Sequence, residues 1–426
     1  MALNELENGD GEESLKGFYT WGRAKNYRLG RATDTNNVRR PELVAALAGI
    51  DVKQGACGGG HTCVVLLDHR LFVFGYSQYG QVGLGDRVDV NAPSQVKIMK
   101  DAHEVHDVVQ VACGRYHTIA LTASGDVYTW GGGKNGRLGH GDEKIRTLPA
   151  KVVALTSPVK FIACGYHSSI AITEQGVYSW GWGAHGQLGH GDSNDRLSPQ
   201  KMKSINDNIV FVTCGDRHGF ALTAEGEVYG WGSNEFGQLG FGDRGEIILK
   251  PVKLENLSGL IIKEISSGDR HSAALTNTGV VYTWGCGSDG QCGHGSYHHS
   301  PRPKALLSIP EPVVHVVCGH NFSMALTVDH NVYAWGSNMY GQLGCYMTES
   351  SVAKPTKIAM NSRVRGLACG HFHGLLWTGP DEGLNKSGRE RSEEELDKAA
   401  SGLLQKLEED RVSRSKMINT LEKLCT

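Results

Sequence analysis

The chain has 426 residues, including 57 glycines and 12 prolines, and its formal net charge is −2. Glycine is roughly twice as frequent as the usual share of about 7%, and the near-zero charge excludes nucleic-acid binding through a broad basic field. No run of about 18 apolar residues is present, so the sequence predicts no membrane-spanning helix.

The N-terminal residues 1–14 are polar and acidic, and they lack the basic and apolar regions of a signal peptide. We therefore predict a flexible segment here, in a protein of the cytosol, the nucleus or both. In such a compartment the 11 cysteines are expected to be reduced thiols.

Three short markers then recur in a fixed order, about every 51 residues. The first is an aromatic residue followed by glycine, at Trp21, Phe74, Trp130, Trp180, Trp231, Trp284 and Trp335. The second is a small residue followed by glycine, at Cys57, Cys113, Cys164, Cys214, Ser267, Cys318 and Cys369. The third is Gly-Gln-Leu-Gly or a close variant, and a proline follows each copy. Seven copies of one unit predict a repeat architecture.

Each unit has the pattern of four short strands. In one unit, Val109–Cys113 is a β-rich run, His117–Thr122 alternates with period two, and Val127–Trp130 follows a Ser-Gly turn. The run around Pro149 is a fourth strand, at a sheet edge where proline is tolerated. Four strands in each of seven units predict an all-β fold, a seven-bladed β-propeller.

The two ends of the array complement each other. The last unit stops after Gly374–Trp377, before its own aromatic-glycine strand, and Gly17–Gly22 supplies that strand at the start. We therefore predict that one blade combines strands from both ends and that residues 15–379 form a single propeller domain. This pairing would remove sheet edges that otherwise invite aggregation.

Residues 380–426 differ in character from the repeats. Residues 380–390 resemble a hinge, and residues 391–426 are charged and helix-forming. Their apolar residues follow a heptad seam, interrupted by Asp410 and Arg414, at Leu396, Leu403, Leu407, Met417, Leu421 and Leu424. The pattern predicts a short coiled coil or docking helix, with homo-oligomerisation as one role; the alternative is a solvated, partly frayed helix.

The recurring motifs Cys-Gly-x-x-His, Gly-x-Val-Tyr-x-Trp-Gly and Gly-Gln-Leu-Gly-x-Gly-Asp resemble the RCC1 (regulator of chromosome condensation) repeat. The resemblance implies a seven-bladed propeller. It also implies one of several functions, because the family includes exchange factors for Ran-type small GTPases, a plant ultraviolet-B photoreceptor, and protein-binding modules of scaffolds and ubiquitin ligases.

Local motifs favour a protein-binding module over the other two functions. In the exchange factor of the family a β-wedge follows the aromatic-glycine pair of the third repeat, whereas Gly131–Gly136 has no insertion here. The photoreceptor depends on Gly-Trp-Arg-His repeats, which this chain lacks. We therefore predict a non-enzymatic protein-protein interaction propeller. The alternative is guanine-nucleotide exchange on a Ran-type small GTPase, and no direct contact with nucleic acid or membrane is expected.

Candidate partner-binding residues occupy the variable positions of the Gly-x-x-His loops. They are Arg115, Tyr116, Asp216, Arg217, Asp269, Arg270, His320 and His371. If the repeats superimpose, these side chains lie on one face. The alternative is that several of them bond adjacent blades.

We expect no catalytic, cofactor or metal site. Three Gly-x-Gly-x-x-Gly segments lack the helix that dinucleotide binding requires, and each unit pairs only one marker cysteine with one histidine. These cysteines are predicted to be small buried residues, and the tips of the histidines to bond neighbouring backbone. Two further histidine-rich segments, residues 101–106 and 294–299, are predicted to be solvated loops, with a partner contact as the alternative.

Overall fold

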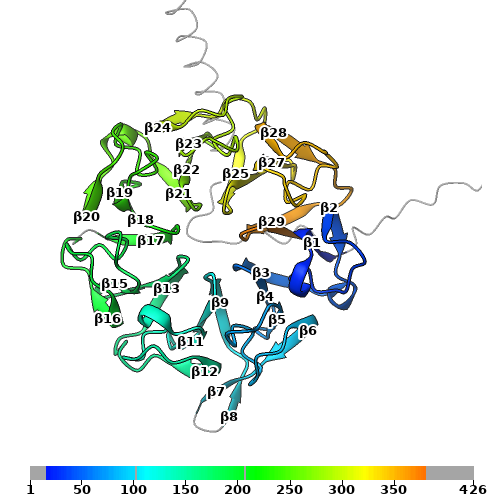
Figure 1. Cartoon of the computed structure of the whole chain (residues 1–426), viewed down its shortest axis with the longest axis vertical. Helices are drawn as coiled ribbons and strands as arrows, with labels where there is room; N and C mark the ends of the chain where they lie inside the picture. The colour runs from blue at the N-terminus through cyan, green and yellow to red at the C-terminus, as the bar shows by residue number, and fades with distance from the viewer. Residues whose placement is uncertain (1–15, 101–102, 206–207, 380–426) are drawn as a thin grey trace, which may run out of the picture.

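The structure is a ring of seven four-stranded antiparallel sheets around a central axis (Figure 1). It is a computed structural model that describes residues 16–100, 103–205 and 208–379. An eighth, two-stranded sheet pairs β7 with β8. The predicted seven-bladed β-propeller is therefore confirmed.

Each sheet runs from a first strand beside the axis to a fourth strand at the rim (Figure 1). The first strands are β3 (Val52–Cys57), β9 (Val108–Cys113), β13 (Val159–Cys164), β17 (Ile209–Cys214), β21 (Ile262–Ser267), β25 (Val313–Cys318) and β29 (Val364–Cys369). The second strands are β4 (His61–Leu66), β10 (His117–Thr122), β14 (Ser168–Thr173), β18 (His218–Thr223), β22 (His271–Thr276), β26 (Phe322–Thr327) and β30 (His373–Thr378).

The two outer positions complete each sheet. The third strands are β5 (Leu71–Gly75), β11 (Val127–Gly131), β15 (Gly176–Gly181), β19 (Val228–Ser233), β23 (Val281–Gly285), β27 (Val332–Ser337) and β1 (Gly17–Arg23). The fourth strands each contain one of the predicted prolines, and they are β6 (Val90–Val96), β12 (Arg146–Lys151), β16 (Arg196–Lys201), β20 (Ile247–Lys253), β24 (Ser300–Ala305), β28 (Ser351–Ile358) and β2 (Asn37–Leu43).

The closing sheet joins the two ends of the chain as the sequence predicts. Its strand order is β2-β1-β30-β29, and β1 pairs with β30 from Gly17 opposite Thr378 to Gly22 opposite His373. Six residue pairs hold this antiparallel contact. The described chain therefore begins and ends at the same end of these two strands, the end that lies away from Gly22 and His373.

The remaining described segments are turns and loops with four short 3-10 turns, η1 (Lys25–Tyr27), η2 (Ala45–Leu47), η3 (Lys134–Gly136) and η4 (Glu255–Leu257). No helix in the described ranges has the length and apolar character needed to span a bilayer. The predicted acidic segment 1–14, hinge 380–390 and helical tail 391–426 lie outside the described residues, as does the predicted tail seam.

The core consists of seven apolar clusters, and each fills the space between two neighbouring sheets. In the cluster between the sheets of β4 and β10, for example, Val65 and Val73 pack against Trp130 of the next sheet. The marker tryptophans are fully buried. Since no sheet has a core of its own, stability depends on every neighbour being present.

The glycine that ends each Gly-Gln-Leu-Gly marker makes room for the marker aromatic residue of the following sheet. A Cβ atom at Gly83, whose φ is +76°, would lie 2.6 Å from Nε1 of Trp130. The same indole nitrogen donates a hydrogen bond of 2.9 Å to the carbonyl oxygen of Gln81. The spacing of the marker is therefore set by contact between neighbouring sheets.

The marker histidines bond a hydroxyl group on the next sheet. Nε2 of His61 lies 2.9 Å from Oγ1 of Thr118, which donates its own hydrogen to the carbonyl of Gln81 at 2.8 Å. The histidine must therefore donate from Nε2. The same arrangement joins His117 to Ser169, His218 to Ser272, His271 to Ser323 and His373 to Thr62, at 2.8–3.0 Å. The prediction that the histidines bond backbone directly is wrong, because a hydroxyl lies between the ring and the carbonyl.

Two sheet boundaries lack this pair, and both partners are replaced together. Ser168 stands in place of a histidine, and Gly219 stands in place of the hydroxyl that it would contact. Phe322 likewise replaces a histidine, and Gly374 replaces the facing hydroxyl. A histidine thus occurs only where the next sheet offers an acceptor, as expected if an unpaired buried N–H is costly.

One segment predicted to be a solvated loop forms a hairpin. The insertion between the second and third units contains β7 (Ile98–Lys100) and β8 (His103–Val105), which project at the rim in Figure 1. Nζ of Lys100 lies 2.9 Å from Oδ2 of Asp126 on the next sheet. In the other segment, His294 is held by Oγ1 of Thr283 at 3.0 Å. Both predictions of solvated loops are therefore incomplete.

Removing one hydroxyl should destabilise the propeller, and replacing its histidine should recover part of the loss. Ser323→Gly leaves the N–H of buried His271 unpaired, and we expect a cost of about 1–3 kcal/mol in the free energy of unfolding. The double variant His271→Phe/Ser323→Gly reproduces the Phe322 and Gly374 pair. It should be at least about 1 kcal/mol more stable than the sum of the single variants predicts, as measured by urea unfolding. If the two substitutions change the free energy of unfolding additively, this result would contradict the pairing of His271 with Ser323.

Stability should fall as the pH drops below the ordinary histidine range. Burial lowers the pKa of His61, His218 and His271 from 6.5 to about 3. Between these values the unfolded chain binds protons that the folded chain does not, so the free energy of unfolding decreases as the pH falls. Each histidine accounts for roughly 2–3 kcal/mol between pH 6.5 and about 4.5. In urea unfolding at these two pH values, His271→Phe/Ser323→Gly should lose less stability than the unmodified chain; an equal loss would refute this account.

Candidate functional site

The Gly-x-x-His loops join the first and second strands of each sheet, and together they surround the axis on one face, here called the loop face. Backbone hydrogen bonds connect successive loops around the axis: Arg115 N donates to Tyr166 O, Tyr166 N to Gly215 O, and His371 N to Gly58 O. These bonds measure 3.1–3.3 Å. The first variable residue of each loop therefore lies beside the axis and the second lies farther out.

Residues at the first variable position form an axial cluster, composed of Arg115, Tyr166, Asp216, Asp269, His320 and His371. The rings of Tyr166 and His371 stack with centroids 3.8 Å apart and planes inclined by 16°. The guanidinium of Arg115 lies 5.8 Å from the Tyr166 ring. His320 contacts both rings, at 5.7 and 5.3 Å. The cluster thus joins loops from opposite sides of the ring across the axis.

Two carboxyl groups within this cluster, those of Asp216 and Asp269, have raised pKa values. Burial is the main cause of both shifts, and the neighbouring charge of Asp269 also raises the pKa of Asp216. Nε2 of His320 lies 3.5 Å from Oδ2 of Asp269. Arg217 and Arg270 lie on their outer sides, 3.3 and 3.4 Å from these carboxylate oxygens.

Aromatic side chains form a belt outside the axial cluster on the loop face. This aromatic belt comprises Tyr76, Tyr79, Tyr116, His167, Trp182 and His185, with successive ring centroids 4.7–6.3 Å apart. The loops that follow Gly75 and Gly181 contribute to it, and they lie beside the Gly-x-x-His loops because Trp182 N donates to the carbonyl of His167 and Tyr76 N to that of Gly60. Arginines continue the ring: Arg270 covers Phe236 at 4.8 Å, and Arg23 covers Tyr340 at 4.8 Å.

The eight predicted partner-binding residues all lie on this face, but at different depths. Asp269 and His371 are only 5% and 9% exposed, and they contact neighbouring loops. The half-buried residues are Arg115, Tyr116, Asp216, Arg217, Arg270 and His320. The inner residues therefore bond adjacent blades, and the outer ones are accessible, so that partner binding stays a prediction for the outer residues.

Sequence reasoning missed the residues that follow the aromatic-glycine pairs. Tyr79, Trp182 and Tyr340 extend the accessible aromatic surface beyond the Gly-x-x-His loops. The sequence does contain one signal for this surface: Trp182 follows the marker pair Trp180-Gly181 but is not itself part of the marker.

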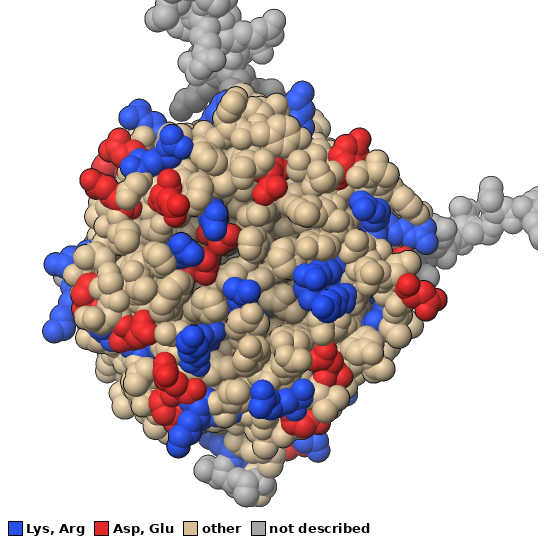
Figure 2. Space-filling view, in the orientation of Figure 1, with Lys and Arg blue, Asp and Glu red and all other residues tan. Residues whose placement is uncertain are grey.

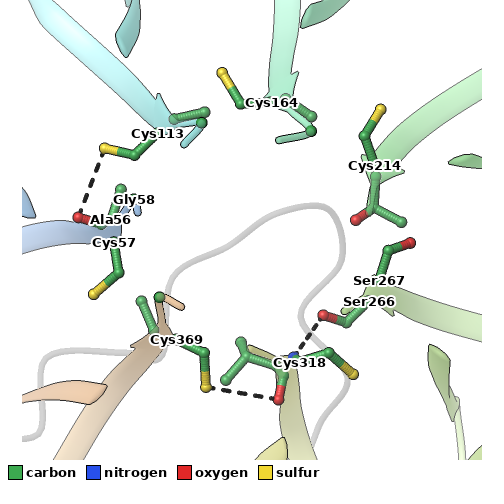
Figure 3. Close-up of a pocket in the computed structure, with 18 of the residues that line it drawn as sticks. Ala56, Cys57, Gly58, Cys113, Cys164, Cys214, Ser266, Ser267, Cys318 and Cys369 are labelled. Carbon is green, nitrogen blue, oxygen red and sulfur yellow. Dashed lines mark hydrogen bonds between the residues drawn. The ribbon is translucent and has the colours of Figure 1, made fainter. Parts of the chain in front are cut away.

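A cavity of about 270 Å³ lies along the axis beneath the axial cluster. Tyr166, Asp269, His320 and His371 are part of its lining. Figure 3 shows the ring that surrounds it, with one marker residue from each first strand: Cys57, Cys113, Cys164, Cys214, Ser267, Cys318 and Cys369. The thiols lean toward neighbouring strands, as Sγ of Cys113 does toward the carbonyl of Ala56 at 3.8 Å. These cysteines act as packing residues between blades.

Comparison with known proteins agrees with this architecture. The family model for the RCC1-like domain matches residues 14–207 and 199–394. The chain is 32% identical over 392 residues to the E3 ubiquitin-protein ligase HERC2 of Homo sapiens, covering 89% of this chain and 7% of that protein. It is 36% identical over 328 residues to the ultraviolet-B receptor UVR8 of Arabidopsis thaliana, covering 76% and 62%.

Solved structures share the fold at lower identity. Human WBSCR16 superimposes with a TM-score of 0.76 at 24% identity, covering 86% of this chain and 99% of that one. Prp20p of Saccharomyces cerevisiae, characterised for binding to Gsp1p and histones, superimposes with a TM-score of 0.77 at 23% identity, covering 92% and 95%. These two structures support the fold alone.

Neutralising Asp216 should stabilise the axial cluster near neutral pH. The raised pKa means that the contribution of this carboxyl is present in acid and is lost as the pH rises through its folded value. Asp216→Asn keeps a donor toward Asp269 without the charge. We expect the free energy of unfolding to rise by about 1 kcal/mol at pH 7 and to change less at pH 4. Exposed Asp329→Asn is the control; a loss of stability at pH 7 specific to Asp216→Asn would contradict an unfavourable charge at Asp216.

Proposed function

Because this chain belongs to the RCC1-like domain family, we propose that it is a non-enzymatic protein-interaction propeller whose loop face binds a segment of a partner protein. The aromatic belt and its flanking arginines carry the proposal. Tyrosine, tryptophan and arginine are the side chains most enriched at the energetic centres of protein interfaces, and half-buried examples of all three surround the axis on this face.

The charge of the loop face favours an acidic partner segment. Figure 2 shows basic side chains gathered near the centre of the molecule, with most acidic side chains nearer the rim. The side chains of Arg217 and Arg270 are 34% and 43% exposed. The side chains of Asp216 and Asp269 beneath them are 14% and 6% exposed. The accessible charge at the centre is therefore mainly positive. Carboxylates of a partner can pair with these guanidinium groups, and aromatic or apolar side chains can pack on the belt.

Exchange activity on a Ran-type small GTPase is the second candidate. Similarity of fold to Prp20p supports it, since that protein binds Gsp1p. The local geometry favours it less, because the loop after Gly131 is a tight turn containing η3 and has no inserted wedge. The insertion of this chain, β7–β8, lies instead in the connection between two sheets.

We propose a separate role for the C-terminal tail. Residues 391–426, with their predicted seam, would supply a docking or oligomerisation helix for the propeller. Gly379 ends the described chain at the side of the closing sheet opposite the Gly-x-x-His loops. A tail-mediated contact would therefore start from the face away from the aromatic belt and leave the loop face accessible.

Partner capture by the loop face should depend on the aromatic belt. We expect Tyr79→Ala/Trp182→Ala, and separately Arg115→Glu, to lose the same set of captured proteins by about tenfold or more, as measured by quantitative mass spectrometry of affinity eluates. The matched control is Val153→Ala/Leu307→Ala, which alters side chains that are 79% and 71% exposed beyond the other ends of the strands. Equal capture by all variants would refute the loop-face proposal.

Two further experiments distinguish capture by the loop face from capture by the tail and from nucleotide exchange. A chain ending at Gly379 shows which partners require the tail. A nucleotide-release assay against a panel of small GTPases tests exchange directly, and strong acceleration by the unmodified chain would replace the pure interaction module with the exchange factor.

A further inference from the structure

One pair of neighbouring blades brings together three metal-binding side chains. His61 and Cys63 lie on β4, and Cys113 lies on β9 of the next sheet. Their ligand atoms all lie within 4.8 Å of one another. From this cluster we propose that His61, Cys63 and Cys113 form a binding site for a soft monovalent metal ion, Cu(I).

The cluster results from a substitution that is specific to this blade. The residue two places after the marker histidine is apolar in the six other second strands, at Ile119, Ile170, Phe220, Ala273, Met324 and Leu375. The adjacent boundary shows the same geometry without a second thiol: Nε2 of His117 lies 3.5 Å from Sγ of Cys164, with Ile119 at the position of Cys63. The repeat pattern of one marker cysteine and one histidine per unit does not include Cys63, which adds the third ligand.

The distances suit an ion after a small contraction. Bond lengths of about 2.0 Å to nitrogen and 2.3 Å to sulfur place ligand atoms about 3.5–4 Å apart. The upper limit of 4.8 Å therefore requires movements of about 1 Å at most. Such movement can come from rotation of the Cys113 side chain, whose Sγ makes a weak 3.8 Å contact with the carbonyl of Ala56. Cys113 also lines the axial cavity, which gives an ion a route to the site.

The donor set favours Cu(I) over harder ions. Thiolates are soft ligands that select Cu(I) or zinc, and zinc completes a tetrahedron with a fourth ligand. Three side chains suffice for a trigonal Cu(I) centre. On binding, the ring proton of His61 moves from Nε2 to Nδ1, so that Nε2 gives up its hydrogen bond to Thr118 and binds the metal. Each thiol releases one proton to solvent, so that one Cu(I) and two thiolates leave the site with one negative charge.

The test is a Cu(I) titration of the reduced full-length chain under anaerobic conditions, in competition with the chromogenic chelator bathocuproine disulfonate. We expect one equivalent to be retained by the unmodified chain and lost in Cys63→Val and in Cys113→Ser. Cys164→Ser is the matched control and should keep the ion, because it alters the corresponding cysteine of the next blade. Serine is compatible with this position, as Ser267 shows.

A gain of binding makes the test independent of damage to the fold. Ile119→Cys places a second thiol beside His117 and Cys164, and it should raise the stoichiometry from one Cu(I) to two. A parallel titration with Zn(II) reports whether the site instead prefers a four-coordinate ion. The proposal is overturned if the unmodified chain retains no Cu(I), if Cys63→Val retains as much as the unmodified chain while both show the same circular dichroism, or if Zn(II) binds more tightly than Cu(I).

Discussion

A hydrogen bond from a buried histidine to a hydroxyl on the next sheet joins the blades at five of the seven boundaries, and the arrangement of the loops depends on it. It joins the second strand of one blade to the second strand of the next. The hydroxyl in turn donates a hydrogen bond to a carbonyl in the Gly-Gln-Leu-Gly turn of the first blade. At three of these boundaries the marker tryptophan donates to the same carbonyl, as Trp130, Trp284 and Trp335 do to those of Gln81, Gln238 and Gln291. Neighbouring blades are thus fixed in height and rotation by polar contacts inside an otherwise apolar boundary.

This constraint also determines where recognition can occur. Each Gly-x-x-His loop is held at one end by its buried histidine, or by Ser168 or Phe322, and by backbone bonds to the adjacent loop. Only the two residues between are free to vary. The inner ones meet across the axis and form a polar cluster, in which Tyr166 stacks on His371. The outer ones join residues such as Tyr79 and Trp182 in the aromatic belt. A rigid frame with variable loops is the arrangement that binding proteins commonly use.

Much of the fold could be predicted from the sequence because the same three markers recur at nearly constant spacing in seven units. The spacing of the aromatic-glycine pairs gave the number of blades, and the incomplete unit at each end gave the pairing of Gly17–Gly22 with β30. The histidine contacts could not be predicted in the same way. They join residues about 55 positions apart, such as His61 and Thr118, and become visible only when neighbouring units are superimposed.

The candidate site was predicted only in part for a related reason. The variable loop positions do share one face, as expected from the sequence, but the sequence does not show that Asp269 and His371 turn inward while Arg217 and Arg270 remain accessible. That difference comes from the distance of each loop position from the axis. Cys63 was overlooked because it departs from the repeat at an apolar position, where a cysteine resembles any small core residue.

Native-state amide hydrogen exchange at increasing urea concentration tests most directly whether contacts between blades make the ring a single cooperative unit. The account predicts that the slowest amides of all seven second strands, including β30 of the closing sheet, converge on one free energy of opening that equals the global free energy of unfolding. Separate free energies for individual blades, with those of the closing sheet opening first, would contradict it.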